Sequence, residues 1–126
     1  GMASPDDRRY LESHEWFKLD GDQIIVGISR FAVDELTDIT YVDVTDPDGA
    51  IANGKPFGEI ESVKATSDLY SGIDGQIVTI NEKVLDSPAL INEDPWNSGW
   101  IIRVQPQDLS QLGKLLSAAE YDTKNA

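Results

Sequence analysis

The sequence predicts a mainly β protein with flanking helices, and three observations support this prediction. Short stretches with alternating or β-branched apolar residues recur along the chain, and turn signals separate them. Two segments, residues 30–36 and about 108–120, instead carry apolar residues at helical spacing. The length of 126 residues suits one modest core. We therefore expect a small sandwich or barrel with its helices on the outside.

The first third of the chain predicts a hairpin followed by a short helix. Trp16 is expected to be a core residue, since large aromatic side chains usually are. Asp20-Gly21 is a hairpin-type turn signal, and Gln23–Ile28 is typical of a buried strand. Ser29 is a good helix N-cap, so Arg30–Leu36 is predicted to be helical.

The central part of the chain predicts strands on both sides of one lysine. Ile39–Val44 alternates and is rich in β-branched residues, which favours a strand. Pro56–Val63 alternates roughly between apolar and polar residues, and Gln76–Ile80 follows after Tyr70 and two glycines. Strand patterns on both sides place Lys64 at or near the tip of a hairpin.

The region after these strands predicts mostly irregular structure and one strand. Asn81–Leu85 is predicted to be a short helical turn capped by Asn81. Residues 86–98 are predicted to be a loop without a helix, because Pro88 and Pro95 push the residues before them toward extended conformations. Gly99–Val104 is predicted to be a strand.

The pattern of the C-terminal segment predicts one amphipathic helix at about residues 108–120. Asp108 can cap it, and Gln111 completes a capping-box pattern. Gly113 costs roughly 1 kcal/mol relative to alanine, but burial of the apolar face should outweigh this cost. That face is formed by residues at helical spacing, namely Leu109, Leu112, Leu115, Leu116 and Ala119.

Composition excludes several classes of function. Ten basic against 23 acidic residues give a formal charge of −13, which disfavours nucleic acid and anionic membranes as partners. The charge either speeds encounter with proteins that have basic rims or serves solubility alone. Without cysteine and with one histidine, the chain offers no disulfide, no thiol nucleophile and no typical metal site.

The chain is expected to form a single domain over residues 10–126, preceded by a flexible N-terminal extension at residues 1–9. Ala3–Arg9 is polar and has no apolar region of the kind that signal peptides contain. No apolar run approaches the length that a transmembrane helix needs. We therefore expect a cytoplasmic protein.

Lys64 is the candidate functional residue, because an exposed amine at a turn can serve as an attachment point for a cofactor. The alternative is that Lys64 is one of many solubilising surface charges. Several landmark motifs occur around Lys64 and elsewhere in the chain, namely Glu61–Asp68 with Tyr70-Ser71, Ser13–Trp16, Val26–Ile28, Phe31-Ala32, Ser87-Pro88, Leu90–Asn92 and Gly99-Trp100. In their residues, order and approximate spacing they resemble the glycine cleavage system H protein family.

The resemblance implies a hybrid barrel-sandwich fold and a lipoyl carrier in which Lys64 holds lipoate in amide linkage. Such a carrier is not an enzyme. It takes an aminomethyl group of glycine from a pyridoxal-phosphate decarboxylase, the P protein, to a tetrahydrofolate-dependent aminomethyltransferase, the T protein. Dihydrolipoyl dehydrogenase, the L protein, then reoxidises its dithiol. A lipoate ligase or lipoyl transferase is the implied partner that loads Lys64.

The resemblance also implies a cleft that shelters the loaded arm. The matching positions are Ser13, Glu15 and Asp68, with Ile28 and Ala32 as apolar lining. Glu15 is the residue that we expect to pair with the ammonium of the aminomethyl group. The alternative for Glu15 is a solvated carboxylate without a role.

Other roles stay open on the sequence alone. Glu61 is either a recognition point for the ligase or a charge that keeps a hairpin edge soluble. Gly72 stands where the family usually has proline, and Val44-Thr45 stands where it usually has Leu-Pro. A lipoate-relay protein for 2-oxoacid dehydrogenases needs the same lysine, and a structural or binding module with a bare Lys64 is a further alternative.

Overall fold

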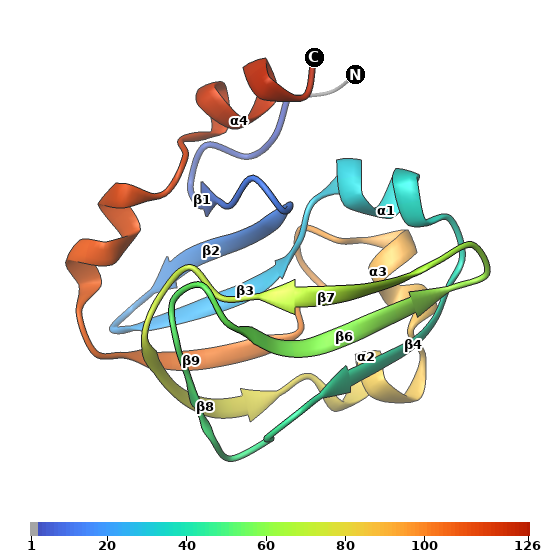
Figure 1. Ribbon diagram of the computed structural model, residues 1–126, viewed down its shortest axis with the longest axis horizontal. Helices are drawn as coiled ribbons and strands as arrows, with labels where there is room; N and C mark the ends of the chain where they lie inside the picture. The colour runs from blue at the N-terminus through green and yellow to red at the C-terminus, as the bar shows by residue number, and fades with distance from the viewer. Residues whose placement is uncertain (1–2) are drawn as a thin grey trace.

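Two antiparallel sheets form the frame of the protein in a computed structural model that describes residues 3–126 (Figure 1). In spatial order, the larger sheet consists of β1 (Arg9–Tyr10), β2 (Glu15–Asp20), β3 (Gln23–Ile28), β9 (Ile102–Pro106), β8 (Gly75–Ile80) and β5 (Ala50–Ile51). The smaller sheet consists of β4 (Ile39–Val44), β6 (Pro56–Ser62) and β7 (Thr66–Tyr70). The predicted β architecture is therefore confirmed.

Short helices lie outside the sheets. They are α1 (Arg30–Leu36), α2 (Glu82–Asp86), α3 (Ala89–Glu93), the 3₁₀ helix η1 (Leu109–Lys114) and α4 (Ala118–Lys124). In Figure 1, α4 lies beside the segment that leads into β1, and Ser4 contacts Asp122 of this helix. Over the described part of the chain, each helix is too short or too polar to cross a bilayer.

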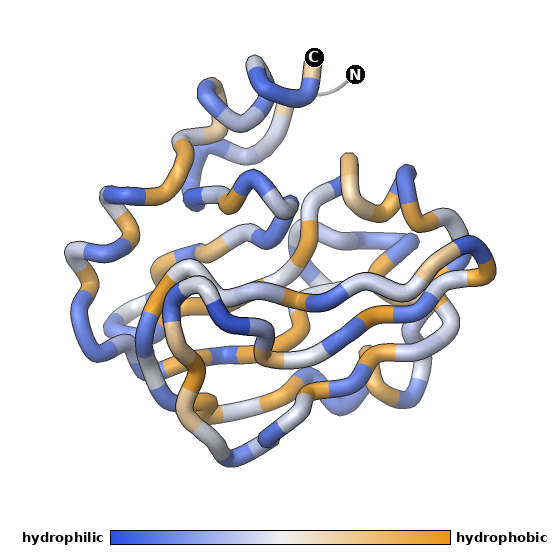
Figure 2. Tube along the Cα trace, viewed as in Figure 1, coloured by the Kyte–Doolittle hydropathy of each residue, from blue (hydrophilic) through white to orange (hydrophobic). Residues whose placement is uncertain are grey.

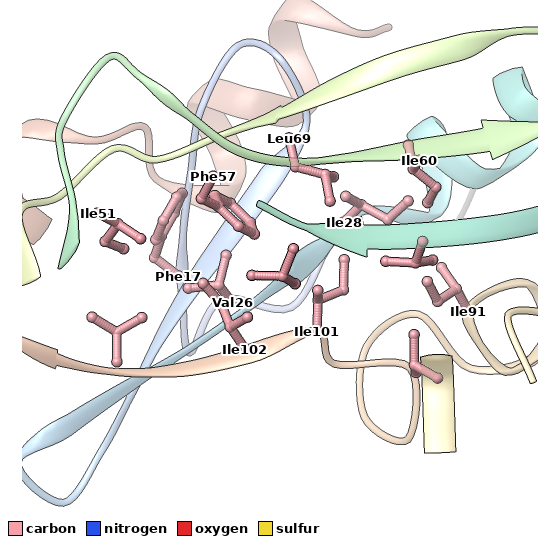
Figure 3. Packing of buried hydrophobic residues seen from close by; sticks show 14 of the residues in the cluster. Phe17, Val26, Ile28, Ile51, Phe57, Ile60, Leu69, Ile91, Ile101 and Ile102 are labelled. Carbon is pink, nitrogen blue, oxygen red and sulfur yellow. The ribbon is translucent and has the colours of Figure 1, made fainter. Parts of the chain in front are cut away.

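The main core fills the space between the two sheets. Figure 3 shows side chains of the larger sheet, such as Phe17 and Val26, packed against Phe57, Ile60 and Leu69 of the smaller sheet. Hydrophobic and hydrophilic residues alternate along the strands (Figure 2), because successive side chains of a strand point to opposite faces. A second cluster joins Trp16, which is 1% exposed, to residues of the two chain ends.

Several predicted elements are confirmed at their predicted positions. The strands Gln23–Ile28 and Ile39–Val44 have the predicted bounds, and so does the helix Arg30–Leu36. The Ser29 side chain accepts a hydrogen bond from the Ala32 N–H at 3.2 Å, as an N-cap should. The strand predicted from Gly99 begins later, at Ile102.

The prediction that residues 86–98 form a loop without a helix is wrong, because α3 occupies Ala89–Glu93. Pro88 has helical dihedral angles (φ −55°, ψ −24°) and begins the turn. Proline fits the start of a helix, where its missing N–H would have no partner in any case. The restriction before proline falls on Ser87 and on Asp94, which bracket the helix.

The predicted single helix at about 108–120 is also wrong. The segment forms η1, then an extended stretch, and then α4. The Leu116 N–H donates to the Tyr10 carbonyl, and the Tyr10 N–H donates to the Leu116 carbonyl, both at 2.9 Å. This strand-like pairing requires an extended backbone, so it outcompetes the helical preference of the leucines. A capping box between Ser117 and Glu120 then starts α4.

Residues 1–9 were predicted to be a flexible extension, but Ser4 and Arg8 contact the rest of the protein. Residues 1–2 lie outside the described part of the chain. The Ser4 hydroxyl donates to the Asp122 carboxylate at 2.6 Å. Arg8 is 6% exposed, and its guanidinium lies 4.6 Å from the ring centre of Trp16. The guanidinium also donates to the Trp96 carbonyl at 2.7 Å. This segment is therefore part of the packed structure.

Candidate functional site

Lys64 lies at the tip of the β6–β7 hairpin, in the turn that joins the two strands, and it is exposed. The turn is closed by a hydrogen bond from the Ser62 N–H to the Ala65 carbonyl at 2.8 Å. The Ser62 hydroxyl oxygen accepts further bonds from the N–H groups of Lys64 and Ala65, at 3.1 and 3.0 Å. Because Ser62 holds the turn, the lysine side chain is not needed to maintain it.

The hairpin tip leans against the end of α1. The Val63 N–H donates to the Asp38 carbonyl at 3.0 Å, and Lys64 Nζ donates to the Glu35 carbonyl at 3.2 Å. Within residues 3–126, no carboxylate lies within ion-pair distance of Nζ. The amine is therefore held by one exposed hydrogen bond, from which an approaching enzyme can readily displace it.

A cleft of about 370 Å³ opens beside the hairpin. One wall comes from α1, another from the start of β2 and the end of β3, and a third from β6 and β7. Its lining residues are Ser13, His14, Glu15, Ile28, Phe31, Ala32, Glu35, Leu36, Ile60, Ser67, Asp68 and Leu69. Since the Lys64 amine contacts the carbonyl of one of these residues, Glu35, an arm attached to the amine starts at the rim of the cleft.

Glu15 is a buried carboxylate in the wall of this cleft, with 1% of its surface exposed. It begins β2, where its pairing with Ile28 of β3 holds the backbone inside the sheet. One carboxylate oxygen accepts from the Ser13 hydroxyl at 2.5 Å, and the other accepts from the Tyr70 N–H at 2.9 Å. Burial raises the pKa of Glu15 to about 7, although both hydrogen bonds oppose this shift.

The cleft brings together all of the residues that the sequence analysis assigned to a shelter. Ser13 and Asp68 are exposed at its edge, whereas Ile28 and Ala32 form part of its buried apolar lining. Glu61 does not line the cleft and lies on β6, three residues before Lys64. The roles of these residues in holding an arm, and of Glu61 in recognition by a ligase, stay predictions.

The fold also brings to the cleft several residues that were not predicted. Phe31, Glu35 and Leu36 come from α1. Phe31 and Glu35 are four residues apart, as are the predicted Ala32 and Leu36, and this spacing places each pair on one helix face. This spacing could have indicated them. His14 also lines the cleft. No local sequence pattern indicates that His14 lies in the cleft wall, because the hydrogen-bond partner of its ring is Tyr121, 107 positions away.

Comparisons with known proteins agree with this architecture. The family model described as glycine cleavage H-protein matches residues 8–126. A glycine cleavage system H protein of Bacillus cereus (strain AH820) is 42% identical over 120 residues, covering 95% of this chain and 94% of the relative. One of Bacillus anthracis (strain A0248) matches to the same extent. A crystal structure of such a protein from Mycobacterium marinum has a TM-score of 0.88 at 38% identity, covering 97% and 98% of the two chains.

The fold and the displayed lysine define a lipoyl-domain-like barrel-sandwich, which is the class predicted from the sequence. The chain belongs to the glycine cleavage H-protein family. It is a lipoyl carrier of the glycine cleavage system and not a catalyst, and its cofactor is lipoate bound covalently to a lysine. Its partners are components of that system.

Proposed function

We propose that Lys64 is the lysine that carries lipoate, and that the adjacent cleft shelters the aminomethyl group during transfer. The position of the lysine is the observation that carries this proposal. Its amine stands at the tip of a hydrogen-bonded hairpin and contacts the cleft rim through the Glu35 carbonyl at 3.2 Å. A tethered group stays at high effective concentration near its carrier and is not lost to bulk water.

The residues present suit a lipoyl arm. The cleft combines apolar side chains from Ile28, Ala32 and Leu69 with acidic groups from Glu15 and Asp68. An apolar lining suits the dithiolane ring, and carboxylates suit an ammonium. When bound, lipoate supplies a disulfide that accepts the aminomethyl group on one sulfur and is reduced to a dithiol over the cycle.

Glu15 is the residue that we propose to hold the ammonium. Its carboxylate is buried and hydrogen-bonded to Ser13 and Tyr70, so its position is fixed before the arm arrives. A cation beside a buried carboxylate favours the charged form of that carboxylate. Docking of the loaded arm should therefore lower the pKa of Glu15 from about 7, and binding should strengthen as the pH rises through that value.

We infer four specific partners within and around the system. They are the P protein, the T protein, the L protein and a lipoate ligase or lipoyl transferase. The net charge of −13 supports encounter with basic surfaces on these proteins. Glu61 remains our candidate for recognition by the ligase. A cytoplasmic location remains a prediction, which cell fractionation would check.

The decisive experiment is an intact-mass measurement after incubation with a lipoate ligase, lipoate and ATP. We expect the mass of one added lipoyl group in the wild-type chain, and its loss in Lys64→Arg. Lys55→Arg is the matched control, because Lys55 is another exposed lysine near the same hairpin. Lipoylation that persists in Lys64→Arg, or that disappears in Lys55→Arg alone, would refute the assignment.

A further inference from the structure

His14, the only histidine of the chain, lies in the cleft wall in an unusual backbone conformation. Its φ angle is 84°, in the left-handed region where glycine is favoured and other residues pay a conformational cost. The His14 N–H donates to the Leu11 carbonyl, and the His14 carbonyl accepts from the Ser29 N–H. The backbone therefore holds the imidazole in one place at the cleft.

A buried hydrogen-bond chain connects this imidazole to the C-terminal helix. The Tyr121 hydroxyl lies 2.6 Å from His14 Nδ1 and 2.6 Å from the Ser29 hydroxyl. Ser29 is fully buried and Tyr121 is 1% exposed, so water does not compete for these bonds. The cleft wall thus depends on a residue 107 positions away in the sequence.

Counting hydrogens along this chain of bonds assigns the tautomer of His14. Ser29 Oγ already accepts from the Ala32 N–H, and its own hydroxyl hydrogen has only Tyr121 as an acceptor within the described residues. If Ser29 donates to Tyr121, then Tyr121 donates to His14 Nδ1, and every hydrogen is used. The opposite direction would leave a buried hydroxyl hydrogen unpaired, which costs free energy. The neutral ring proton therefore resides on Nε2.

Nε2–H is consequently the group that His14 offers to an occupant of the cleft. Within residues 3–126, His14 Nε2 has no hydrogen-bond partner. Every fully buried side-chain nitrogen in these residues does have a partner, so Nε2 is not fully buried and is accessible. The Phe31 ring, 4.7 Å away, packs against the imidazole and limits its rotation. Burial also lowers the pKa of His14, which keeps the ring neutral.

We propose that Tyr121 is a positioning residue of the carrier cleft, which acts through His14 by fixing Nε2–H as a neutral donor for the sulfur end of the arm. This inference rests on the proposed function of the cleft. An ammonium only donates hydrogen bonds and is directed to Glu15, whereas sulfur is a weak acceptor and is directed to His14. The two contacts together orient the carried group.

The first test is the tautomer of His14 in the unmodified protein. Since the chain has one histidine, nitrogen-15 NMR of the imidazole at pH 8 is free of overlap. We expect a protonated Nε2 and an unprotonated Nδ1 in the wild type. Tyr121→Phe should give a mixture of tautomers, because Nδ1 loses its donor. A protonated Nδ1 in the wild type, or an unchanged tautomer in Tyr121→Phe, would overturn the inference.

Tyr10→Phe is the matched control for this variant. The Tyr10 ring stacks on Tyr121 at 4.6 Å, but its hydroxyl donates to the Pro5 carbonyl and not to His14. Both variants lose one tyrosine hydroxyl from the same aromatic cluster. A change of tautomer in both would indicate loosened packing and would count against a specific role of Tyr121.

The second test is retention of the arm in the lipoylated protein, loaded with glycine by the decarboxylase. Water that attacks the carried carbon breaks its bonds to sulfur and nitrogen, so that the thiol is freed and formaldehyde and ammonia are released; the ammonia can be followed. Loss of one ordinary hydrogen bond predicts about a two- to tenfold faster release in Tyr121→Phe and an unchanged rate in Tyr10→Phe. An unchanged rate in Tyr121→Phe would overturn this inference alone. Failure of Lys64 to accept lipoate would instead overturn the proposed function.

Discussion

Replacing Glu15 by glutamine is the most informative single change in this protein. Glutamine has the same shape, and its amide can keep both contacts. Its carbonyl oxygen can accept from the Tyr70 N–H, and its NH₂ can donate to the Ser13 hydroxyl. The substitution therefore removes the charge and the titration of Glu15 with little change in packing.

The magnitude follows from the pKa of Glu15, which burial raises from an ordinary 4.5 to about 7. Between these values the unfolded chain releases the proton while the folded chain keeps it, so the free energy of unfolding falls as the pH rises. Below pH 4.5 the ionisation of Glu15 does not reduce the free energy of unfolding, and above pH 7 the reduction is complete. A difference of this size corresponds to about 3 kcal/mol.

Urea unfolding of the wild type and of Glu15→Gln at several pH values between 4.5 and 8 measures this effect. The stability of the variant relative to the wild type should increase with pH by up to about 3 kcal/mol. Exposed carboxylates contribute equally to both proteins, so they cancel in the difference. A stability difference that stays constant over this range would refute the raised pKa.

The same variant should also shorten the lifetime of the loaded arm. Glutamine offers no negative charge to the ammonium, and a hydrogen bond that involves a charged group contributes about 1.5–3 kcal/mol. Release of ammonia from the loaded protein should therefore be about ten- to a hundredfold faster. An unchanged lifetime, in a variant that accepts lipoate normally, would show that Glu15 does not hold the ammonium.

Three further substitutions test the packing that supports the site. Ser117→Ala removes the capping box with Glu120 and should lower the free energy of unfolding by about 1 kcal/mol in urea titrations; no loss would mean that α4 is held by packing alone. Gly27→Ala drives a Cβ into the Trp16 indole and should cost about 1–3 kcal/mol, seen as a lower melting temperature. Arg8→Lys loses the planar stacking on Trp16 and should cost about 1–2 kcal/mol, whereas unchanged melting would indicate that the positive charge alone suffices.

Local sequence patterns predicted the elements whose partners are near in sequence. The strands on both sides of Lys64 and the Ser29-capped helix depend on alternation and capping, which act over a few residues. The predicted loop at 86–98 is wrong because the restriction before proline acts only on Ser87 and Asp94, whereas Pro88 itself suits the start of a helix. The predicted C-terminal helix failed because its leucines find a distant strand partner, Tyr10.

Local patterns in the chain are sufficient to predict the alternating strands, the hairpin that displays Lys64 and, through the landmark motifs, membership of a family of lipoyl carriers. The properties of the cleft depend instead on how distant segments pack. Glu15 has a raised pKa because folding buries its carboxyl group, even though the Tyr70 N–H, 55 positions away, donates to it and opposes the shift. His14 Nδ1 has a hydrogen-bond partner because Tyr121 reaches it from the other end of the chain. Periodicity is a local property, whereas burial and hydrogen-bond direction depend on residues that meet only after folding.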